Sequence, residues 1–448
     1  MSFAKFKCVF LTLVLLHAIG FASCNANGAS GEQSESGDQT GSGSDADGGK
    51  QDGNPSNGKD GGVPAVWQNI SSFDVCPEKE VTYLVYMAAD NDLEPDAIKN
   101  LKSLQKVGSS SNANILVLLD RHSGYDAAEE DRKGADLYYI TCNPGMMNDD
   151  IISEMGELNM ADSVNLQCFL EFACAHYPAK HMILNIWSHG FGVHSDGLIP
   201  KSVIRDDNTN NSGASSMRII DMAKAIRNFE NRKGCHLDLM QFDCCDMQMI
   251  EVAFQLRDLA DYVAAPLTEI LANGSDYEAI AGYLKNGYSK EEFPGFLVES
   301  FYNRQKNNII NIVYSYVETS RFSEFTPVFD AFCESLIGFA KTDFTHLKRI
   351  RDSIVLLDDT IPEAVDLMCF ANNMSGDIDI AALAASFSEL VPAVKATDID
   401  GNVFSGLGIN FPCNAGQYGK YKAESGDFLD FYLETKWADF MREYMGNM

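Results

Sequence analysis

The sequence has 448 residues, enough for two ordinary domains or for one enlarged α/β domain with additions. Hydrophobic residues make up 45% and charged residues 22% of the chain, which is typical of globular proteins and argues against a fibrous one. The formal net charge of -30 argues against a nucleic-acid partner, because binding to phosphates requires a basic face.

The first 23 residues have the composition of a secretory signal peptide. Lys5 and Lys7 form a positively charged start, residues 9–21 are apolar, and two small residues precede Cys24. A cysteine in this position resembles the lipobox of bacterial lipoproteins, which implies cleavage before Cys24 and acylation of its sulfur and amine. We therefore expect an exported lipoprotein on the periplasmic side or the cell surface, with ordinary cleavage and secretion as the alternative.

Residues 24–66 form a biased segment before the folded part. The segment consists mainly of Gly, Ser, Asp, Asn, Lys and Gln, with almost no large apolar side chains. Such a composition cannot bury a core, so we expect a disordered tether that holds a folded domain away from the membrane. The folded part is expected to comprise a core at residues 67–280 and a C-terminal extension at residues 281–448 packed on it.

From about residue 81, apolar strands alternate with amphipathic helices. The expected strands cover residues 82–89, 113–119, 136–141, 182–188 and 237–242, and the expected helices cover residues 95–107, 163–176, 220–230 and 247–259. This alternation predicts an α/β fold with a mainly parallel sheet. After about residue 273 the pattern becomes mixed, with helices expected at 292–304, 325–340 and 378–390 and strands at 309–317 and 406–411.

Two of these strands end in side chains suited to catalysis. The strand at 182–188 is followed by His189, and the strand at 237–242 is followed by Asp243, Cys244 and Cys245. If both strands lie parallel in one sheet, their carboxyl ends share the edge at which open α/β folds bind ligands. The imidazole and a thiol would then meet. Cys245 is also expected to open the next helix, a position that lowers the pKa of a thiol.

The other cysteines do not form the pattern of a disulfide framework or a zinc site. Most are expected to be small buried side chains within apolar elements, namely Cys168, Cys174, Cys333 and Cys369. Cys142, Cys235 and Cys413 lie near the ends of elements, and whether they pair stays open.

Further motifs accompany the two strand ends. They comprise residues 83–91 (YLVYMAADN), 157–160 (ELNM), 251–253 (EVA), 405–409 (SGLGI) and 437–440 (WADF). Together they resemble the clostripain family of cysteine peptidases, in the caspase-like group that includes gingipains and legumains. The resemblance implies a caspase-like fold, with a mainly parallel sheet flanked by helices and a C-terminal α+β extension. The family usually has Ala where Cys244 stands, and the alignment from Asp243 to Glu251 favours Cys245 as the nucleophile.

The resemblance implies a role for each of these residues. Cys245 attacks the scissile carbonyl to form a thioester, and His189 protonates the leaving amine. The backbone N–H groups of Gly190 and Cys245 form the oxyanion hole.

Asp243 is expected to border the specificity pocket, because side chains on a strand repeat every second residue and Asp243 shares a face with Cys245. A carboxylate there favours protein or peptide substrates with Arg or Lys at the cleavage site, as the family does. Glu269 or Asp276 could supply a second acid. The alternative for Asp243 is an N-cap of the following helix.

The stretch at residues 194–217 is expected to be an exposed loop that carries Lys201 and Arg205. Such loops are sites of proteolytic nicking, and the family is cut between its His and Cys segments. Self-cleavage after Lys201 is favoured over Arg205, because residues 202–206 could form a short strand; a passive loop is the alternative. No cofactor is required by the chemistry, although the family allows calcium, which residues 206–207 or 398–400 could bind.

Two other functions stay open at this point. The chain could be a tethered, non-catalytic binding protein that retains a caspase-like fold, with His189 and Cys245 as structural residues. It could also be a transpeptidase that uses the same thioester. Labelling of Cys245 by a thiol-reactive peptide, lost in His189→Ala, separates the enzymes from the binding protein.

Overall fold

The computed structural model describes residues 64–193, 202–209, 213–308, 310–357, 361–397, 401, 403–414 and 429–448. Asp60–Met448 form one compact unit. The expected signal peptide, the lipidation site Cys24 and nearly all of the expected tether lie outside the described residues. Within the described residues, no helix is both long enough and apolar enough to cross a membrane.

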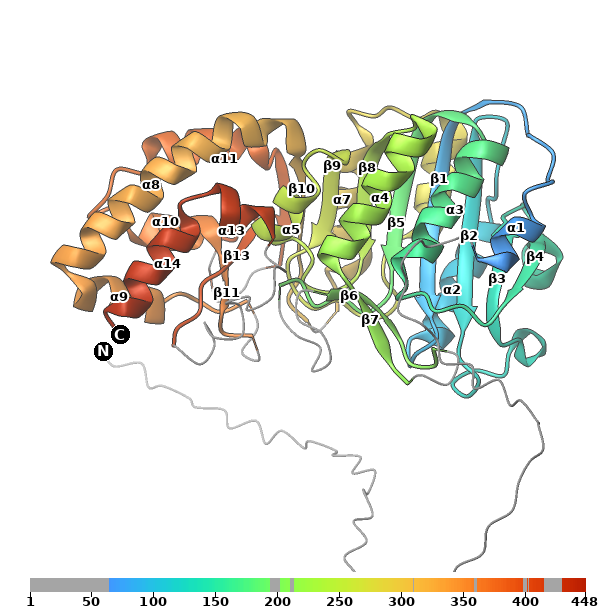
Figure 1. Cartoon of the computed structure of the whole chain (residues 1–448), viewed down its shortest axis with the longest axis horizontal. Coiled ribbons are helices and arrows are strands. Elements are labelled where there is room, and N and C mark those ends of the chain that lie inside the picture. Colours follow the sequence, from blue (N-terminus) through green and yellow to red (C-terminus); the bar gives the residue numbers. More distant parts are fainter. Residues whose placement is uncertain are drawn as a thin grey trace, which may run out of the picture. The chain divides into compact units, whose positions relative to one another are not determined.

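A nine-stranded sheet lies at the centre of this unit (Figure 1). Its strands follow the order β12-β10-β9-β8-β5-β1-β2-β3-β4. The strands β9, β8, β5, β1 and β2 are parallel to one another, whereas β10, β12, β3 and β4 pair antiparallel. In chain order the strands are β1 (Lys79–Ala89), β2 (Ala113–Arg121), β3 (Gly134–Tyr139), β4 (Ile151–Gly156), β5 (Ala179–Trp187), β8 (Leu237–Asp243), β9 (Ala260–Pro266), β10 (Val313–Glu318) and β12 (Ala393–Ala396). The expected mainly parallel sheet is confirmed.

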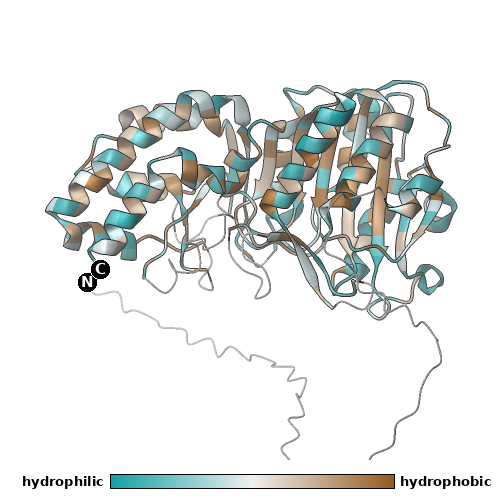
Figure 2. Ribbon diagram, viewed as in Figure 1, coloured by the Kyte–Doolittle hydropathy of each residue, from teal (hydrophilic) through white to brown (hydrophobic). Residues whose placement is uncertain are grey.

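The central strands are mainly apolar and are buried along most of their length, because helices cover both faces of the sheet. On one face, α3 (Ser163–His176) and α4 (Ile219–Lys233) share a core with strand residues such as Leu84 and Tyr86. On the other face, α2 (Glu94–Gln105), α6 (Tyr277–Asn286) and α7 (Phe293–Gln305) pack with Tyr83 and Val85. Figure 2 shows how the hydrophobic residues gather in the strands between these layers.

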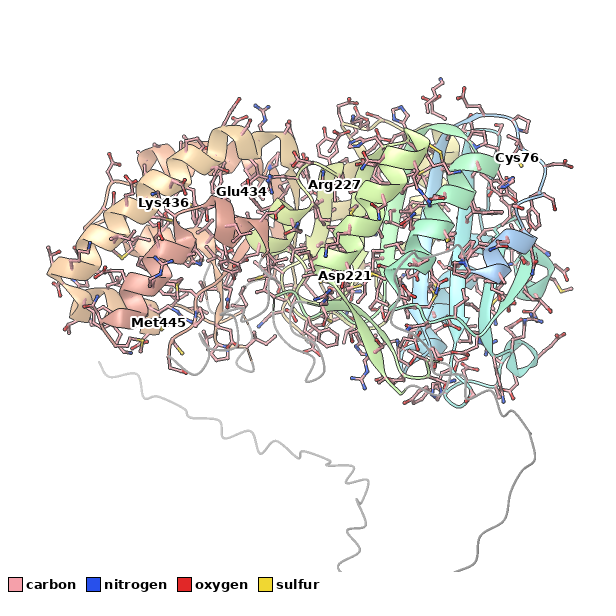
Figure 3. All side chains as sticks on the ribbon, in the orientation of Figure 1. Cys76, Asp221, Arg227, Glu434, Lys436 and Met445 are labelled. Carbon is pink, nitrogen blue, oxygen red and sulfur yellow. A yellow bond between two sulfur atoms is a disulfide. The ribbon has the colours of Figure 1, made fainter. Side chains whose placement is uncertain are left out.

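The C-terminal part has a second apolar core, formed mainly by helices. The elements are α8 (Phe322–Thr342), α9 (Phe344–Asp352), β11 (Ala364–Asp366), α10 (Leu367–Asn373), α11 (Ala381–Leu390), β13 (Gly408–Asn410), α13 (Asp430–Glu434) and α14 (Trp437–Gly446). Polar contacts join this part to the elements that follow β8. Glu251 accepts a hydrogen bond from the backbone of Asn410 at 2.9 Å, and Glu434, labelled in Figure 3, binds Arg257 at 2.8 Å.

The remaining helices and strands are short. They are α1 (Ala65–Asn69), α5 (Ile250–Gln255), the antiparallel pair β6 (Ser202–Asp206) and β7 (Ser215–Arg218), and the 3-10 helices η1 (Glu129–Asp131), η2 (Met147–Asp150) and η3 (Thr319–Arg321). The helix expected at 247–259 is therefore shorter than predicted.

A disulfide joins Cys174 in α3 to Cys235, which lies between α4 and β8. The expectation that Cys174 is only a small buried side chain was wrong. The two residues are 61 positions apart and meet because α3 and α4 pack side by side on the sheet, a relationship that cysteine spacing alone does not reveal. Cys142 keeps a free thiol.

Candidate active site

Three neighbouring strands deliver polar side chains to one edge of the sheet. Cys245 follows β8, His189 follows β5 and Asp92 follows β1, and these strands are adjacent and parallel. The ends of β5 and β8 are level, because Trp187 pairs with Asp243. All three side chains line one cavity of about 300 Å³. The sequence-predicted His189 and Cys245 thus share a cavity at the carboxyl ends of the parallel strands.

His189 is held by contacts on several sides. Its Nε2 donates a hydrogen bond to Asp92 Oδ1 at 2.8 Å, and its ring lies against Phe191 at a centroid distance of 6.2 Å. Its carbonyl oxygen accepts a hydrogen bond from the N–H of Ile204 in β6 at 3.1 Å. When the imidazole is neutral, a proton on Nε2 leaves Nδ1 as the acceptor and hence as the candidate base.

Gly190 lets the His189 segment lie directly against the backbone of Cys245. A Cβ atom at position 190 would lie 2.4 Å from the carbonyl oxygen of Cys245 and 2.6 Å from the Cβ of Cys244. Any side chain at position 190 would therefore push the two segments apart. The two N–H groups proposed for the oxyanion hole, those of Gly190 and Cys245, belong to these touching segments.

Cys245 lies on a tight turn and not at the start of a helix. The next residue, Asp246, has φ of 58°, a left-handed conformation that non-glycine residues adopt rarely. The turn is held to the neighbouring strand, since the N–H of Gln248 binds the carbonyl of Pro266 at 2.9 Å. Helix α5 begins only at Ile250, so the expected helix N-terminus at Cys245 was wrong.

The thiol of Cys245 is accordingly not acidic in this conformation. Burial raises its pKa to about 12, contrary to the expected lowering, and the N–H of Ile270 opposes this shift by donating a hydrogen bond to Sγ at 3.4 Å. A neutral thiol needs a base to take its proton during attack, and His189 on the same cavity is suited to that task.

The two adjacent thiols have different environments. Cys244 is 1% exposed, its Sγ donates to the carbonyl of Ile186 at 3.2 Å, and burial raises its pKa well above its usual value. Cys245 is half-buried and lines the cavity, whereas Cys244 does not. Of the two thiols, only Cys245 is therefore placed to meet a substrate.

Asp243 lies at the bottom of the same cavity, where hydrogen bonds fix its carboxylate. Oδ2 accepts from the hydroxyl of Tyr277 at 2.7 Å and from the N–H of Ser275 at 3.0 Å. Oδ1 is buried and has no hydrogen-bond partner among the described residues. Asp243 does not cap α5, so the N-cap alternative is wrong. Burial raises the pKa of this carboxyl group, and a cationic partner at Oδ1 would favour its ionised form.

A buried network of hydrogen bonds holds the side chain of Asp243 in place. Tyr277 also accepts a hydrogen bond from Asn185 at 2.9 Å, and Asn185 donates to Tyr83 at 3.1 Å. Tyr83 donates to Gln241 at 3.0 Å, which in turn donates to Ser275 at 3.0 Å. The network links four segments of the chain and restricts the direction in which the Asp243 carboxylate points.

The two candidates for a second acid have different surroundings. Glu269 is exposed and lines the cavity. Asp276 does not line it; its side chain caps α6 by accepting a hydrogen bond from the N–H of Ala279 at 3.1 Å.

Gly274 lies directly over Asp243. A Cβ atom there would be 2.4 Å from Asp243 Oδ2, and the φ of Gly274 is +50°.

Of the two expected cleavage residues, only Arg205 lies within the described residues. Lys201 lies outside them, as do residues 398–400. Arg205 belongs to β6, as the expected short strand at 202–206 requires. Its Nε donates to Asp207 Oδ1 at 2.7 Å, and its carbonyl accepts a hydrogen bond from Asn91 at 2.8 Å. The backbone of Arg205 is therefore engaged in the fold.

Sequence reasoning missed three residues of this site. Asp92, Gly274 and Tyr277 were given no role. Asp92 follows the first strand of the α/β pattern, so the rule that singled out His189 and Cys245 could have found it. Gly274 and Tyr277 lie after β9 in an irregular loop and at the start of α6, and no local pattern in the sequence points to their contacts with Asp243.

The chain was compared with known proteins and matches one family. The model of the clostripain family matches residues 85–444. Clostripain of Hathewaya histolytica is 27% identical over 250 residues, which represent 51% of this chain and 47% of that protein. The chain thus spans about half the length of that curated relative.

Solved structures share the fold. The X-ray structure of a secreted C11 cysteine protease from Bacteroides thetaiotaomicron, in complex with an irreversible peptide inhibitor, matches with a TM-score of 0.61 at 22% identity, over 80% of this chain and 99% of that one. The structure of an inactive zymogen C11 protease from Parabacteroides distasonis also has a TM-score of 0.61 at 22% identity, over 81% and 99%.

Proposed function

Since the chain belongs to the clostripain family, we propose that it is a cysteine endopeptidase that cleaves peptide bonds after Arg or Lys. The observation that carries this proposal is the single cavity lined by His189, Cys245 and the buried carboxylate of Asp243. A base, a nucleophile and an anionic pocket are the three components that such a reaction requires.

In the proposed reaction each of these groups has one task. Sγ of Cys245 attacks the scissile carbonyl carbon while its proton passes to Nδ1 of His189. The N–H groups of Gly190 and Cys245 stabilise the oxyanion. The C–N bond then breaks, His189 returns the proton to the leaving amine, and a thioester remains on Cys245. Water, deprotonated by His189, hydrolyses the thioester and restores the thiol.

The charge of the pocket sets the specificity. A guanidinium or ammonium group that enters the cavity is proposed to pair with the carboxylate of Asp243, whose buried Oδ1 has no hydrogen-bond partner among the described residues and whose Oδ2 is bound by Tyr277 and Ser275. A neutral or acidic side chain would leave that buried oxygen without a partner, which is unfavourable. Glu269 at the exposed rim adds negative charge that attracts a basic residue.

Both parts of the proposal can be tested with a panel of short fluorogenic peptides. The peptides differ only in the residue before the scissile bond. Arg and Lys peptides should be hydrolysed, and Asp or Leu peptides should not. Hydrolysis should disappear in Cys245→Ala. A wild-type chain that cleaves none of the peptides and binds no thiol-reactive peptide would favour the non-catalytic binding protein. Formation of an amide in the presence of a competing amine would indicate the transpeptidase.

The chain is further proposed to cut itself between the His189 and Cys245 segments. Lys201 precedes β6, and the hydrogen-bonded backbone of Arg205 makes Arg205 a poorer target. Denaturing gels and N-terminal sequencing of the wild type and of Cys245→Ala test this. A new terminus at Ser202, found only in the wild type, is expected; a fully active uncut chain would contradict self-cleavage.

Export as a lipoprotein through Cys24 is proposed for the N-terminus. The disulfide between Cys174 and Cys235 supports an oxidising compartment. In the native host, Cys24→Ser should move the protein from the membrane fraction to the soluble one. If both forms fractionate alike, lipid anchoring at Cys24 is wrong.

A further inference from the structure

The last turn of α7 holds the loop that lies over Asp243. Arg304 donates hydrogen bonds from Nε to the carbonyl oxygen of Gly274 at 3.1 Å and from Nη2 to that of Asn273 at 2.9 Å. The buried side chain of Gln305 donates to the same Gly274 oxygen at 2.7 Å and to Asn273 Oδ1 at 2.9 Å. Neither Arg304 nor Gln305 lines the cavity, so both act on the proposed specificity pocket only through the loop.

One peptide unit connects these two side chains to Asp243. Its carbonyl group, on Gly274, accepts hydrogen bonds from Arg304 and Gln305. Its N–H group, on Ser275, donates to Asp243 Oδ2 at 3.0 Å. Because the unit is planar and trans, the C=O and N–H groups point in opposite directions. A cation bound at the oxygen polarises the unit and strengthens the hydrogen bond that the N–H group makes at the other end.

Arg304 also brings a positive charge near a buried carboxylate. Burial raises the pKa of the Asp243 carboxyl group, and its hydrogen-bond donors and the charge of Arg304 oppose this rise. Other ionisable groups near the carboxylate are Tyr83 on β1, Tyr277 on α6, Tyr314 on β10 and the thiols of Cys244 and Cys245, with the exposed Glu269 at the rim of the cavity. Burial raises the pKa of these tyrosines and thiols, which are therefore neutral at physiological pH. The charge of Arg304 thus favours the ionised form of Asp243.

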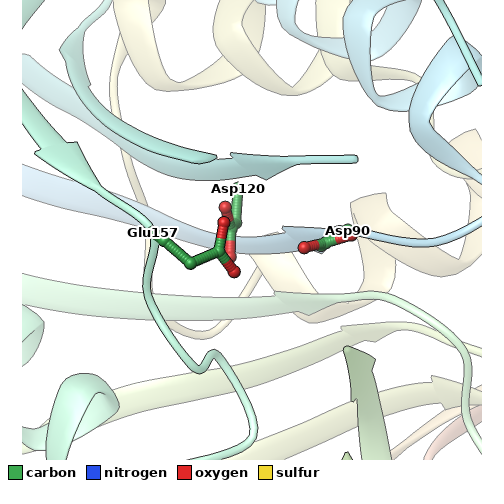
Figure 4. A group of neighbouring side chains, drawn as sticks. All are labelled: Asp90, Asp120 and Glu157. Carbon is green, nitrogen blue, oxygen red and sulfur yellow. The ribbon is translucent and has the colours of Figure 1, made fainter. Parts of the chain in front are cut away.

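A second group of acids at this edge of the sheet shows what burial does without such support. Figure 4 shows Asp90, Asp120 and Glu157, which lie at the ends of β1, β2 and β4. Neither carboxylate oxygen of Asp90 has a hydrogen-bond partner among the described residues, and burial raises its pKa to about 7. Without its donors and the nearby cation, Asp243 would lose its charge in the same way, and with it the basis for binding a basic side chain.

We propose that Arg304 is a positioning residue of the specificity pocket, which acts through the peptide unit of Gly274 and Ser275 to keep Asp243 ionised and fixed for a basic side chain. This inference rests on the proposed preference for Arg and Lys. It assigns the charge of the pocket to a pair of side chains instead of to Asp243 alone. Because its donors bind two loop carbonyls and it does not line the cavity, Arg304 supports the carboxylate without occupying the pocket.

Arg304→Gln and Arg304→Lys form a matched pair that differs in charge, since both side chains can donate to the loop carbonyls. Calorimetry on the full chain in the Cys245→Ala background, which lacks the proposed nucleophile, measures binding of a short Arg peptide without cleavage. Arg304→Gln should weaken this binding about tenfold at about pH 5 and much less at about pH 8, because without the cation Asp243 takes up a proton at higher pH. Arg304→Lys retains the charge and should stay within about threefold of the Cys245→Ala parent at both pH values.

The active enzyme and a control variant separate this role from a structural one. In the active enzyme, Arg304→Gln should raise KM for Arg peptides at low pH and leave kcat nearly unchanged, because Arg304 takes no part in the chemical step. Lys306→Gln removes a cation that binds Asn303 and lies over Tyr302, and it should match the parent at both pH values. The melting temperatures of Arg304→Gln and Arg304→Lys should agree, so a difference in binding is not a difference in folding.

Two results would overturn the role of Arg304. One is binding by Arg304→Gln that equals the parent at both pH values. The other is an equal loss in Arg304→Gln and Arg304→Lys that does not depend on pH, because a purely structural role predicts that result. Failure of the proposed function gives a different result: the Cys245→Ala parent would then bind Arg and Leu peptides equally, and this inference would fall with the preference for basic residues.

Discussion

Asp92 Oδ1 lies 2.8 Å from Nε2 of His189, across the ends of the adjacent strands β1 and β5. The hydrogen bond fixes the plane of the imidazole and directs Nδ1 away from Asp92. Although Asp92 also lines the cavity, the proposed reaction passes no proton through it. It is therefore a positioning residue, and its effect should appear in the chemical step more than in substrate binding.

Replacing Asp92 with Asn should lower kcat about tenfold with little change in KM, because an amide oxygen accepts a weaker hydrogen bond than a carboxylate does. Asp96→Asn, which changes a nearby acid paired with Lys99 on α2, is the control and should leave kcat unchanged. A wild-type kcat in Asp92→Asn, or a loss that appears only in KM, would refute the positioning role.

Asp243→Asn should reduce kcat/KM for Arg and Lys peptides by more than about 100-fold. Leaving a desolvated charge without its partner costs on the order of 3 kcal/mol or more, and each 1.4 kcal/mol is a factor of ten. The melting temperature should change little, because an amide at this position can still accept from Tyr277 and Ser275. Cleavage of Arg peptides at an unchanged rate would assign the pocket to another acid, with Glu269 as the next candidate.

Gly274→Ala should impair cleavage after basic residues because the added methyl group collides with the Asp243 carboxylate. Gly145→Ala is a matched control: Gly145 also has a positive φ, of +88°, but a Cβ atom there meets no other atom within 4 Å. Both variants carry the backbone strain of alanine at positive φ, and only Gly274→Ala should raise KM for Arg peptides. Equal KM values in the two variants would show that the loop relaxes away from Asp243.

The fold could be predicted to a large extent from the sequence. The runs at β1, β2, β5 and β8 are long and mainly apolar, and the helices between them have clear periodicity. These two features predict the mainly parallel sheet. Strand β9, the edge strand β4 and the short strands β7, β11 and β12 were not predicted. Strand β4 is half-polar, and β7, β11 and β12 have only three or four residues. Strand β9 directly follows the expected helix at 247–259, and its place in the sheet depends on pairing with β8 and β10, which the local pattern does not show.

The candidate site was predicted mainly where a strand ends in a reactive side chain; Glu269, which also lines the cavity, was predicted from a loop. His189, Cys245 and Asp243 satisfy this condition, and all three line the cavity. The acidity of Cys245 was predicted wrongly, because the length of the turn between β8 and α5 is not visible in the sequence.

The reactivity of the Cys245 thiol should depend steeply on pH. Burial raises its pKa to about 12, so the thiolate fraction of the free enzyme should rise about tenfold per pH unit over the accessible range. Alkylation of Cys245 by iodoacetamide, followed by mass spectrometry of the peptide, should therefore accelerate from pH 6 to pH 9 without a plateau. A plateau below pH 7 would mean that the free enzyme already contains a thiolate beside a protonated His189.

The most direct measurement of the central claim is the identification of the residue modified by an irreversible peptide electrophile that ends in Arg. Mass spectrometry of the labelled wild-type chain should find the adduct on Cys245 and none on Cys244. Labelling should persist in Cys244→Ala, weaken strongly in His189→Ala and Asp243→Asn, and be absent with a peptide that ends in Asp. An adduct on Cys244, or equal labelling by the Arg and Asp peptides, would contradict the account of a basic-specific peptidase with Cys245 as its nucleophile.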